Sequence, residues 1–326
     1  MPRGLLERLA DGPVLGDGGY LLELEKRGYV QAGPFTPEVS LIDPEALAQL
    51  HREFLRAGAE VLQTLTFYAS EDKLATVGLA GKVDDSNLAA VAVARRVAAE
   101  GDALVAGNLS LTWAYDPAER ASEDHVRALF DRQLEVQMEV GIDFVVAETF
   151  SWLGEALIAT ERAKRTGLPV MTTMSFEKEP RAYEGDSAAD CARKLADAGA
   201  DVVGINCLRD PQRTLPIAKE MRAATSAYVA AQPVAYRTSD DSPDFTSLPD
   251  FPLALDPLQL PRAELGSFAL EARDAGINFI GSCCGSVSAH VRAMAQALDK
   301  VPSENRQWRS TDKPMSAVEY YEKADR

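Results

Sequence analysis

Three cysteines are the residues of this sequence whose type and spacing most clearly suggest chemistry. Cys207 lies in the run GINC, and Cys283 and Cys284 are adjacent in the run GSCCG. A chain with few cysteines and no secretory features rarely uses them for disulfides, and thiolates are the preferred ligands of soft metal ions. Glycines on both sides of the Cys-Cys pair let the backbone turn, so that side chains that would alternate in a strand can aim at one point. The trio therefore predicts a zinc–thiolate site.

The competing interpretation is that these cysteines are small buried apolar residues. That is the usual role of an isolated free cysteine. We assign it to Cys191, which begins the helical stretch CARKLADAG and has no cysteine nearby in the sequence. For Cys207, Cys283 and Cys284 the spacing favours the metal site.

Three cysteine ligands leave one tetrahedral position open, which is typical of a catalytic zinc site. A substrate thiol in that position would lose its proton to become a thiolate. Four thiolates around one divalent cation carry a net charge of −2, which keeps the bound sulfur electron-rich and attracts a cationic electrophile. The pattern predicts transfer of an alkyl group from an onium donor to a thiol.

Other chemistries find little support in the residues. His51, His125 and His290 all fall within predicted helices, away from strand ends, which argues against histidine metal sites and a Ser-His-Asp triad. It also argues against a hydrolase that activates water on a metal. No nucleotide-binding glycine motif is present, and the glycines of GDGGY more plausibly expose backbone N–H groups to a small carboxylate.

Composition narrows the class of protein. With 326 residues, 46% of them hydrophobic, the chain can bury a large core. No apolar run approaches the roughly 18 to 20 residues that span a bilayer, and the first residues lack a secretory core, so we expect a soluble, cytoplasmic protein. The formal charge is −16, from 34 basic and 50 acidic residues, which disfavours nucleic acid and anionic membranes as partners. The acidity is typical of a solvated surface and only mildly favours a cationic substrate.

Short apolar stretches alternate with helical stretches along the chain. The apolar stretches are β-branched and continuous, as fully buried parallel strands should be. The predicted strands are 13–16, 60–65, 104–109, 143–147, 169–174, 202–206, 228–232 and 278–281. The predicted helices are 44–57, 86–100, 123–140, 152–167, 186–199, 211–224, 263–275 and 286–299. Eight such units predict an α/β fold, a closed (β/α)8 TIM barrel in a single domain.

Polar and thiol residues gather where the predicted strands end, which is where barrel enzymes place their chemistry. These residues are Asp17, Thr66, Tyr68, Asn108, Glu148, Cys207, Gln232, Cys283 and Cys284. Two long loops, 18–42 and 233–262, are expected to lie over the barrel mouth as functional lids. We expect the barrel domain to cover residues 1–300. Residues 301–326 are expected to form a C-terminal extension that docks on the barrel or on another subunit of a homo-oligomer.

Four runs in order carry a resemblance to a known family. They are GDGGYLLELEKRGYVQAGPFTPE, LHREFLRAGAEVLQTLTFYASEDKL, GINC and FIGSCCG, and together they span about residues 12–299. The sequence resembles the homocysteine S-methyltransferase family, and within it the betaine-homocysteine enzymes. The resemblance implies a (β/α)8 barrel with one zinc held by three cysteines, and transfer of a methyl group to homocysteine to give methionine.

The resemblance also implies roles for individual residues. Cys207, Cys283 and Cys284 would bind Zn²⁺. Asp17 and Glu148 match carboxylates that hold the homocysteine ammonium group, with a structural ion pair as the alternative for each. The amides around Gly18 and Gly19 would meet the homocysteine carboxylate. Tyr68 matches an aromatic residue that faces the methyl donor, although a tyrosine at a strand end is more often packing.

The sequence departs from the betaine enzymes on the donor side. Phe35 stands where those enzymes resemble GPWTPE, and phenylalanine offers a weaker cation-binding face than tryptophan. Thr149 follows Glu148 where they have a tyrosine. The tail is shorter than theirs, and its segment STDKPMSAVEYYE lacks the histidine and basic residues that help to hold the donor carboxylate in those enzymes. We expect a zinc-dependent homocysteine methyltransferase that uses glycine betaine or a related small methyl-onium donor. The alternatives are a sulfonium donor, such as S-methylmethionine, S-adenosylmethionine or dimethylsulfoniopropionate, and a non-catalytic zinc- or thiol-binding barrel.

Overall fold

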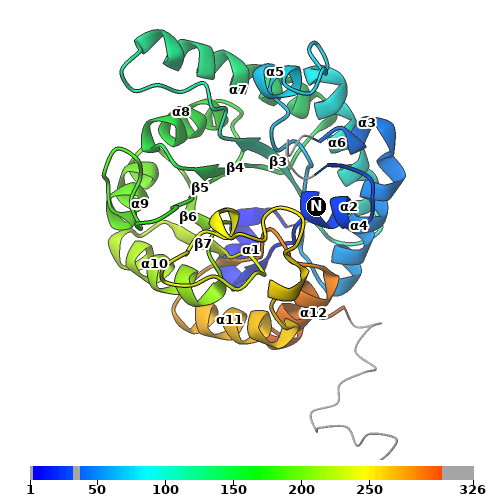
Figure 1. Cartoon of the computed structure of the whole chain (residues 1–326), viewed down its shortest axis with the longest axis vertical. Helices are drawn as coiled ribbons and strands as arrows, with labels where there is room; N and C mark the ends of the chain where they lie inside the picture. Colours follow the sequence, from blue (N-terminus) through cyan, green and yellow to red (C-terminus); the bar gives the residue numbers. More distant parts are fainter. Residues whose placement is uncertain (1–2, 32–36, 303–326) are drawn as a thin grey trace, which may run out of the picture.

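In the part of the chain that the structure describes, eight short parallel strands alternate with helices, as predicted. The computed structural model describes residues 3–31 and 37–302. The strands are β1 (Val14–Leu15), β2 (Val61–Gln63), β3 (Leu104–Ser110), β4 (Phe144–Phe150), β5 (Val170–Met174), β6 (Val202–Asn206), β7 (Tyr228–Gln232) and β8 (Phe279–Ile280). All eight fall at the predicted positions. Figure 1 shows them in the middle of the molecule with the helices as an outer ring.

The strands pair in the order β1-β8-β7-β6-β5-β4-β3-β2, and every pair is parallel. Between β1 and β2 the backbone ladder is replaced by a few specific contacts. The Glu60 amide donates to the Leu15 carbonyl at 2.9 Å, and the Gln63 amide donates to Oδ2 of Asp17 at 2.7 Å. The sheet is therefore a nearly closed barrel, which confirms the predicted (β/α)8 class.

The eight helices that follow the strands also lie where the sequence predicted them. They are α4 (Pro44–Ala57), α6 (Val83–Ala98), α7 (Arg120–Val140), α8 (Leu153–Lys164), α9 (Ala188–Asp197), α10 (Pro211–Ala224), α11 (Arg262–Asp274) and α12 (Ser288–Ala297). Helix α4 shows why the ends are readable. Asp43 caps its first turn by accepting from the Ala46 amide, Pro44 occupies the first position, and Gly58 ends it at φ 117°.

The two segments predicted as long loops also contain short helices. Residues 18–42 contain helices α2 (Leu21–Lys26) and α3 (Val39–Ile42), and residues 233–262 contain the single-turn helices η1 (Phe245–Ser247) and η2 (Asp256–Leu258). Helices α1 (Leu5–Asp11) and α5 (Glu71–Ala75) were also not predicted. These elements have only one or two turns, too few for a hydrophobic period to stand out in the sequence.

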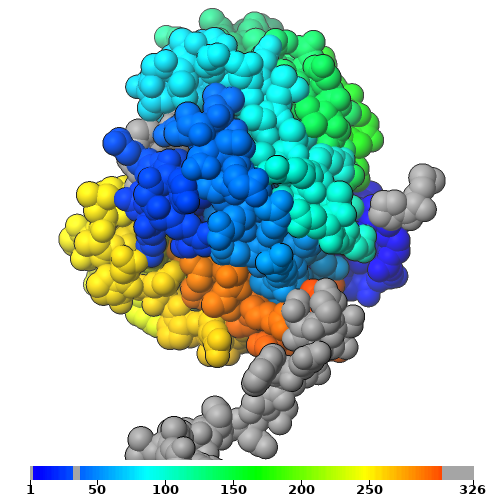
Figure 2. All heavy atoms as spheres, turned by 90° about the vertical axis from the view of Figure 1, so that its right-hand side faces the viewer, coloured from blue at the N-terminus to red at the C-terminus, as the bar shows by residue number. Residues whose placement is uncertain are grey.

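Helix α1 closes the end of the barrel opposite the mouth. Leu5 and Leu9 pack in one apolar cluster with inward-facing strand residues such as Val14, Phe144 and Phe279. In Figure 2 the first residues, in deep blue, and the 233–262 segment, in yellow, lie at opposite ends of the molecule. A larger cluster fills the space between the strands and the surrounding helices. Among the described residues, the barrel interior below the mouth is therefore packed with apolar side chains.

The 301–326 extension falls almost entirely outside the described residues, so its docking stays a prediction. None of the helices in residues 3–31 and 37–302 has the length and apolar character that crossing a membrane requires.

Candidate active site

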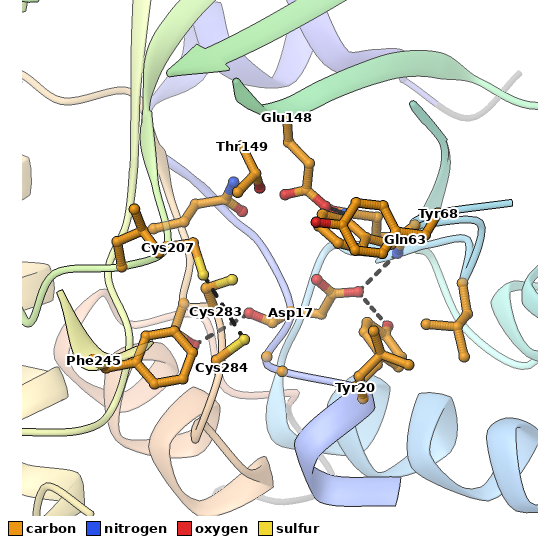
Figure 3. Close-up of a pocket in the computed structure, with 18 of the residues that line it drawn as sticks. Asp17, Tyr20, Gln63, Tyr68, Glu148, Thr149, Cys207, Phe245, Cys283 and Cys284 are labelled. Carbon is orange, nitrogen blue, oxygen red and sulfur yellow. Dashed lines mark hydrogen bonds between the residues drawn. The ribbon is translucent and has the colours of Figure 1, made fainter. Parts of the chain in front are cut away.

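The three predicted cysteines meet at the barrel mouth. Their sulfur atoms all lie within 4.8 Å of one another, and Sγ of Cys207 lies 3.8 Å from Sγ of Cys284. Figure 3 shows the three side chains pointing toward one another. The separation is far longer than the roughly 2.05 Å of a disulfide, so the cysteines are free thiols.

Backbone hydrogen bonds between neighbouring strand ends set these positions. The Cys207 amide donates to the Gln232 carbonyl at 2.9 Å, and the Cys283 amide donates to the Pro233 carbonyl at 2.8 Å. The Cys284 carbonyl accepts from the Ala235 amide at 2.8 Å. The segment that follows β7 thus aligns the end of β6 with the end of β8, which brings residues 76 or more positions apart in the chain to one point.

The donor set fits a tetrahedral zinc ion. Zinc–sulfur bonds of about 2.3 Å at tetrahedral angles place two sulfurs about 3.8 Å apart. The Cys207–Cys284 separation has this value. Three soft sulfur ligands with no hard oxygen ligand among them also match zinc rather than magnesium or calcium.

The thiols affect one another's proton affinity. Contacts from Cys283 and Cys284 hold the pKa of Cys207 well below its usual range. The contact with Cys207, together with burial, raises the pKa values of Cys283 and Cys284 well above theirs. A second buried negative charge beside the first is repelled, so Cys283 and Cys284 hold their protons more tightly than an isolated cysteine does.

Asp17 lies at the end of β1, on the wall of the same pocket. Its Oδ2 accepts from the Gln63 amide at 2.7 Å and from the hydroxyl of Tyr20. The Tyr20 oxygen in turn contacts Nδ1 of His51 at 3.0 Å, and burial lowers the pKa of His51 to about 3, so this ring is neutral. Burial raises the pKa of Asp17 to about 6 in spite of these hydrogen bonds. The chain from His51 through Tyr20 fixes the carboxylate in one orientation.

Glu148 is presented by an irregularity in β4. The register between β4 and β5 shifts between Ala147 and Phe150, and Thr149 has a left-handed φ of 67°. Such a bulge re-aims a side chain at the rim of a barrel. Oε1 of Glu148 accepts from Asn108 Nδ2 at 2.6 Å and from the side-chain Nε2 of Gln63, and burial raises the pKa of Glu148 to about 8.

Asn206, the last residue of β6, holds the bulge in place. Its Nδ2 donates to Oε2 of Glu148 at 2.9 Å and to the Thr149 hydroxyl at 2.7 Å. Its Oδ1 accepts from the Thr149 amide at 2.9 Å and from the Thr173 hydroxyl at 2.8 Å. The hydroxyl of Thr149 is thus used to position β4 against β6.

Gly18 and Gly19 both line the pocket, where the sequence placed them. A Cβ at position 19 would lie 2.7 Å from the Cys283 carbonyl oxygen, and one at position 18 would lie 2.6 Å from the Phe54 ring. The Gly19 amide donates to the Ser286 carbonyl at 3.2 Å. The glycines therefore let the β1 loop approach the Cys-Cys pair closely. Their contact with a substrate carboxylate stays a prediction.

Tyr68 lies on the far side of the pocket and interacts with two further side chains. Its hydroxyl accepts from Nε1 of Trp113 at 2.8 Å, and Nζ of Lys73 lies 4.2 Å from its ring centroid. A cation over an aromatic face is a favourable arrangement. A donor cation that uses Tyr68 must therefore share the ring with Lys73. Phe35, the other predicted donor contact, lies outside the described residues.

One pocket joins the three thiols, Asp17, Glu148, the two glycines and Tyr68 (Figure 3). Its volume of about 160 Å³ is below the roughly 300–1,000 Å³ of sites for drug-sized ligands, so it suits a ligand the size of an amino acid. The predicted strand-end residue Gln232 also lines it, and residues not predicted there include Tyr20, Gln63, Thr149, Phe245 and Thr246. Phe245 and Thr246 belong to the 233–262 segment, so this predicted lid does contribute to the pocket.

Backbone strain concentrates around the pocket. Tyr68, Thr149, Cys207 and Leu208 all line it, and all have left-handed φ values between 55° and 67°. Each such residue costs on the order of 1 kcal/mol or more and persists where the surrounding structure requires it.

Most predicted site residues meet here, and others were missed. Thr66 and Asn108 were expected at the strand ends, but they lie one layer below. The Thr66 hydroxyl donates to the Asn108 carbonyl, and Asn108 holds Glu148. Tyr20, Gln63 and Asn206 were missed. The sequence did carry a signal for Gln63. In the predicted strand EVLQTL, Gln63 is an amide side chain in the middle of a mostly apolar stretch.

The sequence model of the homocysteine S-methyltransferase family matches residues 14–298. The chain belongs to the homocysteine S-methyltransferase family. The matched segment runs from β1 to the end of α12 and includes every residue of the thiol site described above.

Relatives of this homocysteine S-methyltransferase family member carry two different donor names. Betaine–homocysteine S-methyltransferase 1 of Mus musculus is 46% identical over 307 residues, which cover 91% of this chain and 75% of that protein. S-methylmethionine–homocysteine S-methyltransferase of Pongo abelii is 41% identical over 303 residues, covering 91% and 81%. The metallated homocysteine methyltransferase MmuM of Escherichia coli superposes with a TM-score of 0.73 at 21% identity, covering 89% of this chain and 99% of that one. This last likeness supports the barrel fold.

Proposed function

We propose that this protein transfers a methyl group from glycine betaine, or a related methyl-onium compound, to homocysteine, giving methionine, with one zinc ion at the three cysteines. The observation that carries the proposal is the pocket itself. Three thiols within 4.8 Å of one another and two buried carboxyl groups line one small cavity at the barrel mouth. A thiol-bearing amino acid has a thiol to join a metal ion held by the cysteines, and an ammonium group to pair with the carboxyl groups.

The carboxylates suit the ammonium end of the acceptor. Asp17 and Glu148 are both almost fully buried, and their partners Tyr20, Gln63 and Asn108 hold them in place. An incoming ammonium group pairs with both and lowers their pKa values from about 6 and about 8. Buried carboxylates that are already oriented lose little freedom on binding, which favours tight, specific recognition.

Zinc at Cys207, Cys283 and Cys284, when bound, would activate the acceptor thiol by favouring its thiolate form. The rest of the reaction depends on how the chain holds the two substrates. The acceptor sulfur forms a bond to the methyl carbon while the nitrogen–carbon bond of the donor breaks. The electron pair of that bond leaves with the neutral amine. The pocket must therefore hold the donor with its methyl group in line between sulfur and nitrogen.

Aromatic side chains line opposite parts of the pocket, with Phe245 beside the cysteines and Tyr68 across from them (Figure 3). Tyr68 and Phe245 both line it, and ring faces attract an onium head group by roughly 0.5 to 2 kcal/mol each. Transfer removes the donor's positive charge, so the product loses this attraction and leaves. A sulfonium donor is the second candidate, and the name of the Pongo abelii relative supports it.

A donor panel tests the proposal. The zinc-loaded protein is incubated with homocysteine and, in turn, glycine betaine, S-methylmethionine, dimethylsulfoniopropionate and S-adenosylmethionine, and methionine is measured by mass spectrometry. We expect methionine with glycine betaine at the highest rate. Methionine with sulfonium compounds alone would move the donor to the second candidate. Zinc and homocysteine binding without methionine from any donor would instead indicate a non-catalytic thiol-binding barrel.

A further inference from the structure

A second hollow lies beside the thiol pocket, at the ends of β3, β4 and β5. Four aromatic side chains surround it: Trp113 and Tyr115 follow β3, Trp152 follows β4, and Tyr183 follows β5. Its volume is about 70 Å³, which suits one small head group. We call these four residues, with Glu155 at the base, the aromatic cage.

The rings stand as walls and do not stack. Tyr115 and Trp152 have centroids 6.0 Å apart at an interplanar angle of 62°, and Trp152 and Tyr183 have centroids 5.1 Å apart at 86°. Near-perpendicular rings leave faces available to a guest, whereas stacked rings would cover one another. The ring of Tyr115 is seated against the start of α8, where a Cβ at Gly154 would lie 1.9 Å from its hydroxyl oxygen. The cage wall therefore depends on a glycine at that position.

The cage is open to a ligand from solution. Trp113 is 66% exposed and Tyr183 is 45% exposed, although large aromatic side chains are usually buried. Trp113 also has a left-handed φ of 64°. Because the Trp113 side chain is exposed, packing in the core does not explain why its backbone adopts this costly conformation.

The charge of the cage selects the guest. Glu155, in the first turn of α8, is 1% exposed and lines the hollow. Both hydrogen bonds from Thr112, at 2.7 Å from its amide and 2.6 Å from its hydroxyl, end on Oε1. None of the described residues that line the hollow carries a positive charge, and Nζ of Lys73 lies 5.9 Å from the centroid of the Trp113 ring, farther than from the Tyr68 ring. A carboxylate at the base of an aromatic hollow attracts a cation and repels an anion.

We propose that the aromatic cage binds the head group of a methylated ammonium or sulfonium compound, at a site separate from the thiol pocket. Methyl groups contact the rings, and the positive charge faces the ring electrons and the Glu155 carboxylate. Aromatic walls with a negative base are the arrangement that recognises quaternary ammonium groups. The inference concerns binding and does not depend on methyl transfer.

The cage and the thiol pocket share a wall. Nε1 of Trp113, in the cage, donates to the hydroxyl of Tyr68, in the pocket, at 2.8 Å. This hydrogen bond connects the cage directly to Tyr68, the residue that we expect to face the methyl donor. The cage can hold a second onium molecule while the first reacts.

The test uses choline and its uncharged isostere, 3,3-dimethylbutan-1-ol, which has the same shape without the charge. Each is titrated into the purified full chain by isothermal calorimetry, with tryptophan fluorescence followed in parallel. We expect choline to bind at least about tenfold more tightly than the isostere. Trp152→Leu and Glu155→Gln should each weaken choline binding by about tenfold, and Glu155→Gln should reduce the preference for the charged ligand.

The controls separate the cage from other sites. Tyr29→Leu removes an aromatic side chain that is 38% exposed elsewhere on the surface, and it should leave choline binding unchanged. Tyr183→Leu, at the exposed rim, replaces Trp152→Leu if the latter fails to fold. Equal binding of choline and its isostere would overturn the proposal, as would choline binding that survives every cage substitution. Absence of choline binding, with a dimer that Tyr183→Leu disrupts, would assign the exposed rings to an interface between two copies.

Discussion

At the scale of single residues, the site depends on side chains held by several partners each. The three sulfur atoms lie within 4.8 Å of one another, and the two carboxyl groups are bound by neutral donors, so an incoming ammonium group would be the positive partner that favours their charged forms. Substitutions here should separate metal binding, acceptor binding and donor binding from one another, because different residues serve each.

Removing one thiol should remove the metal. We expect the purified protein to hold about one zinc per chain, and Cys283→Ala and Cys284→Ala to lose both zinc and activity, because two thiolates cannot complete the site. Atomic emission measures the zinc content. Cys191→Ala is the matched control, since Cys191 is fully buried in α9 and away from the cluster, and it should keep its zinc. Full zinc occupancy in the Cys207, Cys283 and Cys284 variants would exclude these residues as ligands.

Neutralising Glu148 should weaken the binding of the acceptor, homocysteine, and leave zinc binding unchanged. Glu148→Gln removes a buried charge that we expect to pair with the homocysteine ammonium group, so the Kd for homocysteine should rise by about tenfold to a hundredfold while zinc stays bound. Calorimetry with homocysteine measures the change. Glu155→Gln is the control, because it neutralises another buried carboxylate outside the thiol pocket. An unchanged Kd in Glu148→Gln would remove Glu148 from the acceptor site.

We expect Lys73 to pair with the carboxylate group of the methyl donor. A cation 4.2 Å from the Tyr68 ring centroid repels an onium head group, unless the donor also carries a negative charge to pair with it. We expect Lys73→Met to raise the KM of glycine betaine and dimethylsulfoniopropionate by about fivefold. The KM of trimethylsulfonium, which has no carboxylate, should stay the same or fall. A parallel rise for all three donors would show that Lys73 acts only by supporting Tyr68.

At the scale of elements, the mouth of the barrel is built by irregular strand ends. β4 contains a bulge at Thr149, β6 ends in two left-handed residues, and β8 is only two residues long before the backbone turns into the Cys-Cys pair. Regular strands would alternate these side chains between the two faces. The irregular ends bring groups from β1, β4, β6 and β8 to one side.

The Asn206 amide should be the contact on which the β4 bulge depends. Asn206→Ala leaves Glu148, Thr149 and Thr173 without a shared partner, so we expect a loss of about 2–4 kcal/mol in the free energy of unfolding and weaker homocysteine binding. Urea denaturation and calorimetry measure the two effects. Thr173→Val is the comparison, because it removes a single hydrogen bond and should cost about 1 kcal/mol. Equal effects from the two substitutions would show that Asn206 contributes no more than one bond.

At the scale of the whole molecule, one end of the barrel is packed with apolar side chains and the other end holds the candidate active site. Helix α1 and the lower strand residues form an apolar plug, whereas buried carboxylates and thiols gather at the mouth. Charged groups held in a buried site reduce stability, and the apolar remainder of the barrel must offset that reduction.

This reduction should appear as a dependence of stability on pH. Burial raises the pKa of Glu148 from its ordinary 4.5 to about 8, so the folded chain holds this proton more tightly than the unfolded chain. Its stabilising effect is present below about pH 4.5 and is lost as pH rises through 8. We expect the free energy of unfolding of the wild type, relative to Glu148→Gln, to fall by a few kcal/mol over this window. A difference between the two proteins that stays constant from pH 4.5 to 8, measured by urea denaturation, would contradict the buried state of Glu148.

The sequence by itself determined the elements and the family of chemistry. Eight apolar β-branched stretches and the helical stretches between them predicted the strands and main helices, because burial on both faces leaves a continuous apolar run and helix caps are local. The three cysteines stood out by their spacing, the rule that barrel chemistry lies at strand ends placed Asp17 and Glu148 at the same edge, and the family resemblance implied the roles of these two carboxyl groups. Short elements such as α2 and η1 were not readable, since one or two turns show no period.

Only the tertiary structure decided how these residues act together. The 3.8 Å spacing of Cys207 and Cys284 comes from hydrogen bonds between the ends of three strands, and no local pattern encodes it. Asn206 looked like an ordinary strand residue, yet it links β4 to β5 and β6. The aromatic cage joins residues from three separate loops, up to 70 positions apart. Contacts between residues so distant in the chain arise from the closure of the barrel, which no window of sequence contains.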